Sequence, residues 1–205
     1  MTFNIWHNSG LERTKTHYDY IIIGAGASGL MLANAFGKDP FFKDKAVLLL
    51  DKSPKNSNDR TWCFWEKGAG EFDPIVHKSW DRIFFGGQAY SKQLAIAPYT
   101  YKLIRGIDFY RYNIDKLGSC PNIDFVNAEV LQVEEKKGHV IVKTEANSYT
   151  CGQAFTSIII ADKIRDQKKY PVLHQHFIGW KVKTKEPVFN PHVATFMDFS
   201  IDQKN

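Results

Sequence analysis

The chain has 205 residues, of which 43% are hydrophobic and 14% aromatic, and its formal net charge is +5. This length and apolar content suffice for one large domain or two small ones with a sizeable core, which argues against intrinsic disorder. The lysines are scattered along the chain, so the mildly basic balance predicts no nucleic-acid partner. The three cysteines form no C-x-x-C pair, so neither a disulfide framework nor a metal site is predicted.

Residues 1–17 are polar and are expected to form a loose N-terminal tail without the apolar segment of a secretory signal. The uncharged stretch 20–37 approaches the length of a membrane-spanning helix, but its four glycines predict strand, turn and helix instead. The cysteine usage fits a cytoplasmic protein, and any contact with a membrane is expected to be peripheral.

The most specific pattern is a G-x-G-x-x-G turn between a strand predicted at 18–23 and a helix predicted at 27–37. Gly24 allows the tight turn, Gly26 lets the backbone approach a pyrophosphate, and Gly29 lets helix and strand pack closely. The free N–H groups at the start of the helix then favour negatively charged phosphates. The pattern therefore predicts a dinucleotide site.

A second strand, predicted at 46–51, ends in Asp51, about 20 residues beyond the glycines. Such folds place a carboxylate there that binds a ribose hydroxyl, and the alternative is a solvated charge at the end of a strand. Arg60 follows a polar loop and is a candidate for bidentate binding of the pyrophosphate, with an ordinary surface arginine as the alternative. We assign 18–59 to a dinucleotide-binding βαβ unit.

Short aromatic-rich segments follow and predict strands of a second, antiparallel sheet within 60–100, at 61–65, 81–85 and 88–97. Apolar residues at helical spacing predict a helix over 101–117, where a return to the nucleotide domain over 101–170 begins. That return is expected to contain a third strand of the nucleotide sheet at 123–125, a hairpin of 129–135 with 139–144, and a buried strand at 157–161.

The segments 175–184 and 193–199 alternate apolar and polar residues, as antiparallel strands with one solvated face do. We assign 171–205 to the second sheet. The chain thus predicts an α/β fold in which a Rossmann-like domain that binds FAD or NAD(P) is interleaved with an antiparallel β-sheet substrate domain. Two-domain flavoproteins thread in this way, although the glycine motif itself does not choose between FAD and NAD.

Several strings outside the glycine motif resemble the lycopene cyclase family of FAD-binding carotenoid enzymes. They are N-D-R-T-W-C-F-W-E at 58–66, Y-K-L-I-R-G at 101–106, Q-H-F-I-G-W at 175–180 and A-T-F-M-D-F at 194–199. With the glycine motif they cover most of residues 18–203 in the family's order. The resemblance implies a fold of the p-hydroxybenzoate hydroxylase type.

The resemblance also implies an activity, namely closure of the ψ-ends of lycopene into β-ionone rings, a net isomerisation. The implied cofactor is FAD in its reduced form, with NAD(P)H as the reductant and no net redox change. The substrate would be lycopene or a related carotenoid, which resides in membranes and so implies a cytoplasmic enzyme with peripheral membrane contact.

Cyclisation needs a carboxyl that stays protonated and aromatic faces that stabilise a carbocation. Asp198, flanked by large apolar residues, is the one candidate for this acid, and an outward-facing polar position is the alternative. His176 is expected to be a hydrogen-bonded residue of the sheet rather than a metal ligand. The candidate substrate-pocket residues are Trp62, Phe64, Trp65, His176, Trp180 and Asp198.

The acidic F-L-E-E-T motif, whose glutamate the resemblance gives as the catalytic acid–base, does not occur in this sequence. We therefore expect the chain to be the N-terminal half of a cyclase, or a cut-off gene product, inactive by itself, with the acidic motif beyond Asn205. Two other classes stay open. One is a redox flavoenzyme on an apolar substrate, such as a monooxygenase or a prenyl-chain reductase, and the other is a non-catalytic dinucleotide-binding fragment.

Overall fold

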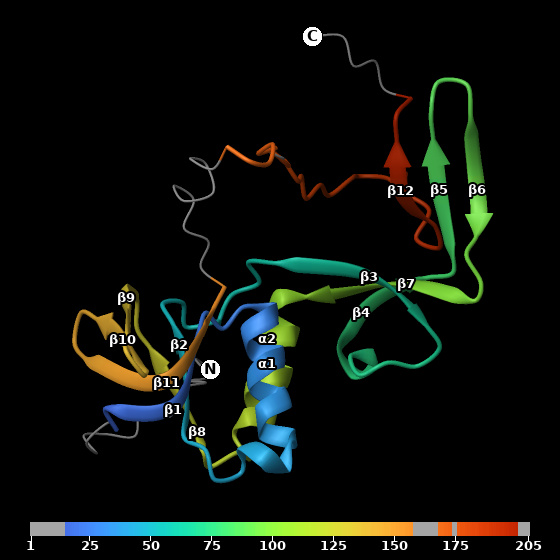
Figure 1. The fold of residues 1–205 in the computed structure, drawn as a ribbon. Coiled ribbons are helices and arrows are strands. Elements are labelled where there is room, and N and C mark those ends of the chain that lie inside the picture. The colour runs from blue at the N-terminus through green and yellow to red at the C-terminus, as the bar shows by residue number, and fades with distance from the viewer. Residues whose placement is uncertain (1–14, 158–167, 174–175, 201–205) are drawn as a thin grey trace. The chain divides into compact units, whose positions relative to one another are not determined.

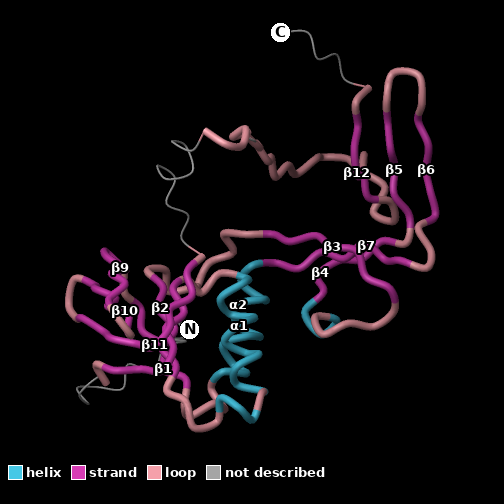
Figure 2. The backbone as a smooth tube through the Cα atoms, in the orientation of Figure 1, coloured by secondary structure: helices cyan, strands magenta, loops and turns pink. Residues whose placement is uncertain are grey.

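The computed structural model describes residues 15–157, 168–173 and 176–200. The chain divides into two compact units, each built from two separate chain segments. Figure 1 labels the helices and strands of both units, and Figure 2 distinguishes helices, strands and loops. Unit 1 consists of residues 1–58 and 107–169, and unit 2 of residues 59–106 and 170–205.

Unit 1 is built around a six-stranded sheet with the strand order β8-β2-β1-β11-β10-β9. At its centre, β1 (His17–Ile23) lies between β2 (Val47–Asp51) and β11 (Ser148–Thr156), parallel to both, and β8 (Ile123–Asn127) pairs in parallel with β2. Parallel strands in this order form the sheet of a Rossmann fold. The three strands of the nucleotide sheet that the sequence predicts are confirmed to within two residues.

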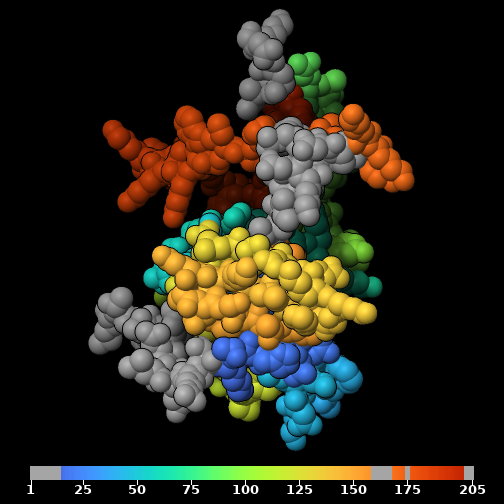
Figure 3. Space-filling view, turned by 60° about the vertical axis from the view of Figure 1, so that its left-hand side comes forward, coloured from blue at the N-terminus to red at the C-terminus, as the bar shows by residue number. Residues whose placement is uncertain are grey.

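The remaining strands of this sheet form an antiparallel hairpin, β9 (Val130–Lys136) and β10 (His139–Thr144). It turns at Lys137-Gly138, where Gly138 has a φ of 86°, so the predicted hairpin is confirmed. Figure 3 shows β9, β10 and β11, in yellow and orange, as one continuous surface beside β1 in blue. Val130 and Val140 of the hairpin pack against the buried core of the sheet.

The sequence does not predict β11 and instead favours a strand at 157–161. Ser157 lies after β11 and outside any strand, and 158–161 lie outside the described residues. The apolar signal of β11 is weak because Gly152 and Gln153 interrupt it. Its two neighbours, β1 and β10, hold it in place, and its Tyr149 and Cys151 are buried in the core.

Two helices pack beside each other in unit 1, α1 (Ala27–Lys38) and α2 (Gly106–Leu117), as Figure 1 shows. The side-chain amide of Asn34 donates hydrogen bonds to the side-chain and main-chain oxygens of Asn113, at 3.1 and 3.2 Å, and so joins the helices. Phe36 of α1 lies against the sheet, with its ring 5.8 Å from that of Phe155. Of the helices in the described part of the chain, none has the length and apolarity needed to cross a membrane.

The predicted helix over 101–117 is wrong in its first part, because residues up to Arg105 belong to β7 (Tyr99–Arg105). This strand pairs with β3 (Thr61–Lys67) along one edge and with β4 (Val76–Trp80) along the other. The apolar spacing crosses a strand-to-helix junction and imitates a single helix. Unit 1 accordingly resumes at Ile107, whereas the sequence places this return at Tyr101.

Unit 2 contains two three-stranded sheets, β3-β7-β4 and β12-β5-β6. The second consists of β5 (Arg82–Gly86), β6 (Ser91–Ala95) and β12 (Ala194–Asp198). The predicted strand at 193–199 is therefore present, but it runs parallel to β5 and not antiparallel. Alternation of apolar residues shows which face of a strand is buried, and it does not give the direction of the neighbouring strand.

The predicted strand at 175–184 is not found in the part of it that the structure describes. Gln175 lies outside the described residues, and 176–184 are exposed and belong to no strand. β4, in contrast, is a strand that the sequence does not predict. In both cases a neighbouring strand determines whether the segment is a strand, because a segment becomes a strand only when a neighbour completes its main-chain hydrogen bonds.

Candidate functional site

The glycine turn follows β1, and its three glycines have different surroundings. Gly24 has a φ of 102°, and its N–H donates to the Leu50 carbonyl at 2.7 Å. A Cβ at Gly29 would collide with the carbonyl oxygen of Gly24, whereas a Cβ at Gly26 would have no described heavy atom within 4 Å. Gly24 and Gly29 are thus needed for the turn and its packing, and Gly26 leaves its surface open to a ligand.

The helix that follows presents its N-terminus at this open surface. Gly26 is the N-cap of α1, no side chain caps it, and the first turn contains no acidic residue. The first N–H groups of a helix have no partner within the helix and carry partial positive charge. The turn and the helix start therefore have the chemistry and the open space that a pyrophosphate needs.

Asp51, at the end of β2, faces this turn and is not a solvated charge. Its side chain is only 9% exposed, and its Oδ2 accepts a hydrogen bond of 2.6 Å from the N–H of Ala25. Its Oδ1 accepts a second one, of 2.7 Å, from the N–H of Ser53. The carboxylate thus braces the glycine turn, while its contact with a ribose hydroxyl stays a prediction.

Sequence reasoning missed Lys55, which lies in the segment predicted as a polar loop. Its Nζ is 3.0 Å from Oδ2 of Asp51, and the residue is 8% exposed. The only indication in the sequence is its distance of four residues from Asp51. Sequence reasoning missed Ser157 as well. Its hydroxyl lies beside the turn, so close to Gly24 that a Cβ on that glycine would collide with it.

Arg60, the candidate for the pyrophosphate, belongs to unit 2, whereas the glycine turn belongs to unit 1. Its side chain is 69% exposed, and its Nε lies 4.0 Å from a carboxylate oxygen of Asp59. Its contact with a pyrophosphate stays a prediction.

Unit 2 has an aromatic cluster that we define by Trp65, Trp80, Tyr101 and Phe196. The ring of Trp65 lies 4.8 Å from Tyr101 and 5.4 Å from Phe196. Tyr101 also contacts Phe196 edge-on at 5.8 Å and Trp80 at 6.0 Å. The cluster thereby connects the two sheets of unit 2, and Trp65 and Phe196 keep 41% and 38% of their surfaces exposed.

The three predicted pocket residues on β3 do not share a face. Side chains alternate along a strand, so Trp62 and Phe64 lie on the face opposite to Trp65. The ring of Phe64 lies 6.4 Å from that of Phe72. Of these three predicted residues, only Trp65 belongs to the aromatic cluster.

The environment of Tyr101 is largely apolar. Burial, together with the side chain of Cys63, raises the pKa of its hydroxyl to about 12. The hydroxyl therefore stays protonated at neutral pH, and the cluster carries no negative charge at this position.

A buried ammonium group occupies the other face of β7. Lys102 Nζ bonds Glu66 at 2.8 Å, Asp73 at 2.5 Å and the carbonyl of Gly68 at 3.2 Å. Its hydrogen bonds to Asp73 and Glu66 raise the pKa of Lys102. All three donors of the ammonium group are used, so this cluster has the properties of a structural crosslink.

The other predicted pocket residues in unit 2 are exposed. Trp180 is 85% exposed, and His176 is also exposed and lies outside any strand. Asp198 accepts hydrogen bonds from the hydroxyl and the N–H of Ser200, at 2.5 and 2.9 Å, and these lower its pKa. A proton donor needs the opposite shift, so the geometry of Asp198 favours the outward-facing alternative.

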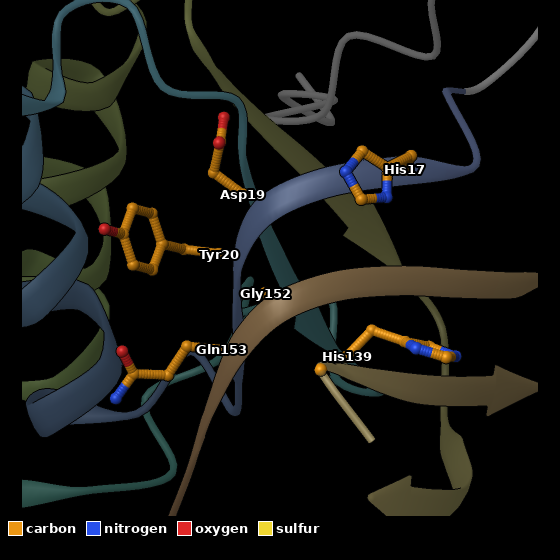
Figure 4. Close-up of a pocket in the computed structure, with 7 residues that line it drawn as sticks. His17, Asp19, Tyr20, His139, Gly152 and Gln153 are labelled. Atoms are coloured by element: carbon orange, nitrogen blue, oxygen red, sulfur yellow. The ribbon is translucent and has the colours of Figure 1, made fainter. Parts of the chain in front are cut away.

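A shallow pocket of about 430 Å³ lies at the start of β1, on the opposite end from the glycine turn. Figure 4 shows His17, Asp19 and His139 around it, with Gly152 of β11 between the strands. Asp19 accepts a hydrogen bond from the N–H of Ala46, and His17 shares one with Thr150. These polar groups serve the fold, and the pocket is not part of the glycine-turn site.

The family model described as "Lycopene cyclase protein" matches residues 19–205, which include parts of both units. Among curated proteins, the chain matches an alcohol dehydrogenase (acceptor) of Pseudomonas putida at 49% identity over 41 residues. That match covers 20% of this chain and 7% of the dehydrogenase.

Among solved structures, p-nitrophenol 4-monooxygenase PnpA of Pseudomonas putida DLL-E4 is similar with a TM-score of 0.57 at 16% identity, over 75% of this chain and 44% of PnpA. PqsL of Pseudomonas aeruginosa, described as a probable FAD-dependent monooxygenase, gives a TM-score of 0.53 at 11% identity, over 77% of this chain and 48% of PqsL. These likenesses show the fold alone and confirm the predicted fold class. The chain spans less than half the length of either protein.

Proposed function

The chain belongs to the lycopene cyclase family, and from this premise we propose that it is part of a flavin-dependent enzyme that closes the ψ-ends of lycopene into β-ionone rings. The observation that carries the proposal is the match of the family over residues 19–205, which spans the glycine turn and the aromatic cluster alike. We propose lycopene or a related carotenoid as the substrate, and a cytoplasmic enzyme in peripheral contact with the membrane that holds it.

The residues of unit 1 fit the ADP part of FAD. The open surface at Gly26 and the uncapped start of α1 would hold the pyrophosphate, and Asp51 would bind the ribose. When bound in its reduced form, with NAD(P)H as the reductant, the flavin supplies an electron-rich ring that stabilises a nearby positive charge. The fold shared with PqsL supports a flavin as the cofactor.

The aromatic cluster suits a hydrocarbon substrate. The partly exposed faces of Trp65 and Phe196 offer apolar contact, and aromatic rings stabilise a carbocation. Two carboxylates lie close in sequence to the aromatic cluster, Glu66 beside Trp65 and Asp198 two residues after Phe196. We assign the acid–base role to neither, since Glu66 forms an ion pair with Lys102 and Asp198 accepts a hydrogen bond from Ser200. We therefore propose no residue of this chain as the catalytic acid.

The test is conversion of lycopene to β-carotene in lycopene-accumulating cells that express the gene in its natural reading frame. Trp65→Ala is expected to lower the rate about tenfold, because a cation–π contact is worth about 1–2 kcal/mol when desolvated. Trp62→Ala, on the other face of the same strand, is the matched control and should lower the rate less than twofold. Equal losses in both variants would contradict a substrate role for the cluster.

A redox reaction on an apolar substrate is distinguished by its consumption of NAD(P)H. A cyclase consumes no reductant in proportion to its product, whereas a monooxygenase or a reductase consumes one NAD(P)H for each product molecule. Stoichiometric consumption with lycopene would replace the proposed isomerisation by the redox alternative.

A further inference from the structure

We infer that Lys55 is a positioning residue of the nucleotide site, which acts through Asp51 to present one carboxylate oxygen to the ribose of an adenine nucleotide. The inference rests on the proposed function, because it assumes that the glycine turn binds such a nucleotide. Nothing in the sequence pattern assigns Lys55 a role.

The first observation is the burial of an ion pair where charges are costly. The side chains of Lys55 and Asp51 are 10% and 9% exposed, and Nζ lies 3.0 Å from Oδ2. A carboxylate with so little access to water is stable only with a charged partner and further hydrogen bonds. Lys55 is the charged partner that the structure provides.

The second observation is the backbone of Lys55, which has a φ of 52°. It is the one residue other than glycine with a positive φ among the described residues. A side chain makes this conformation unfavourable, and such positions usually carry glycine or asparagine. The lysine is held there by its own contacts, since Nζ also lies 5.4 Å from the centre of the buried ring of Tyr110.

The third observation is the allocation of the acceptor positions of Asp51. An ionised carboxylate has about four lone-pair positions, two on each oxygen. Ala25 N–H takes one position of Oδ2, the ammonium group of Lys55 lies against the same oxygen as an ion-pair partner, and Ser53 N–H takes one position of Oδ1. On Oδ1 one position remains, and we assign it to a ribose hydroxyl.

Without Lys55 the carboxylate is expected to rotate toward other donors, because only the two N–H groups then hold it. Its free acceptor position would no longer have a fixed direction. The loss should therefore appear as a loss of discrimination for the ribose hydroxyls, beyond any general weakening of nucleotide binding.

The test compares ADP with 2′,3′-dideoxy-ADP, which lacks the ribose hydroxyls, by isothermal titration calorimetry on the 205-residue chain. The wild-type chain should bind ADP at least about tenfold more tightly, a difference of about 1.4 kcal/mol, since a ribose hydroxyl would donate a hydrogen bond to a charged acceptor. This ratio should fall to about one in Lys55→Met, in Asp51→Asn and in the double variant, without a further loss in the double variant.

The matched control is Lys52→Met. Lys52 lies in the same loop, is 70% exposed and pairs with Glu129, so the variant should keep the tenfold ratio. Lys55→Arg keeps the positive charge and should keep most of the ratio, which provides a second readout if Lys55→Met does not fold.

A tenfold ratio in Lys55→Met with both dissociation constants raised equally would overturn the inference, because Lys55 would then contact the phosphates directly. A wild-type chain that binds both nucleotides equally would overturn it as well, although nucleotide binding would stand. A wild-type chain that binds neither nucleotide would contradict the proposed function itself.

Discussion

Gly26 and Gly29 belong to one motif, but their surroundings give them different roles. A methyl group at Gly29 would enter the space of the Gly24 carbonyl, whereas a methyl group at Gly26 would enter open space. One glycine therefore serves the packing of the fold, and the other serves the surface at which a ligand is proposed to bind.

Substitution of these two glycines should separate stability from binding. Gly29→Ala is expected to lower the free energy of unfolding by about 1–3 kcal/mol, the usual cost of overpacking a close contact. Gly26→Ala should cost less, about 0.5–1 kcal/mol for alanine at the N-cap of α1, and weaken FAD binding, because its methyl group occupies the approach of the pyrophosphate. Urea unfolding and flavin fluorescence titration measure the two effects.

The opposite pattern, a folding defect in Gly26→Ala with normal stability in Gly29→Ala, would contradict this division of roles. Gly68→Ala, at a glycine of unit 2 with a φ of 74°, is a control that should cost stability through its backbone and leave FAD binding unchanged.

Among the elements, the β9–β10 hairpin contains the carboxylate with the clearest pH dependence. Hydrogen bonds from Lys143, and then from Lys136, lower the pKa of Glu134 from 4.5 to about 2. A carboxyl whose pKa is lowered by folding stabilises the fold fully above its unfolded pKa, and this contribution is lost as the pH falls through the folded pKa. The relevant window is therefore about pH 4.5 to about pH 2.

We predict that the wild-type chain has a higher Tm than Glu134→Gln at neutral pH, and that this difference shrinks as the pH falls through that window. The neutral glutamine cannot titrate, so only the wild-type chain loses the contribution. Circular dichroism melts at a series of pH values measure it. Lys143→Met removes the main hydrogen-bond partner of Glu134, so its Tm should also lie below that of the wild-type chain at neutral pH and approach it as the pH falls. A Tm difference between the wild-type chain and Glu134→Gln that stays constant across the window would contradict the assignment.

The elements also show how far the sequence alone can lead. The strands around the glycine turn were predictable, because apolar runs end at glycines or at an acid with the spacing of a nucleotide fold. The split of 101–117 into β7 and α2, the presence of β11 and the direction of β12 depend on strands distant in the sequence. A periodicity within one segment contains no information about those partners.

The same limit applies to the candidate site. Spacing predicted the glycines and Asp51 as candidate residues, because the βαβ unit is local in sequence. The buried pair with Lys55 depends on the conformation of a loop, and the aromatic cluster depends on β12 meeting β3 and β7 from another part of the chain. Composition indicated that aromatic residues were available but not which of them meet.

At the scale of the whole molecule, the described residues include a run of exposed apolar side chains between β11 and β12. Phe177, Ile178 and Trp180 are 81%, 88% and 85% exposed. Contiguous apolar side chains of this size in water favour association with another surface.

The 205-residue chain is therefore expected to self-associate as its concentration rises, which sedimentation velocity measures. Replacing Phe177, Ile178 and Trp180 by serine should abolish this behaviour. A control in which the nearby Lys181 and Lys183 are replaced by serine keeps the apolar side chains and should still associate. A wild-type chain that stays monomeric at all concentrations would contradict the prediction.

The central position of β11 next to β1 has a consequence for the order in which the protein is made. Their paired residues His17 and Thr150 are 133 positions apart, so the ribosome completes β1, α1 and β2 long before β11, the second neighbour of β1, exists. During that time the N-terminal βαβ unit has an open edge of unpaired main-chain groups, which is prone to pair with other chains. Loop closure over such a distance is also slow. The sheet of the nucleotide unit can thus be completed only after β11 has been made.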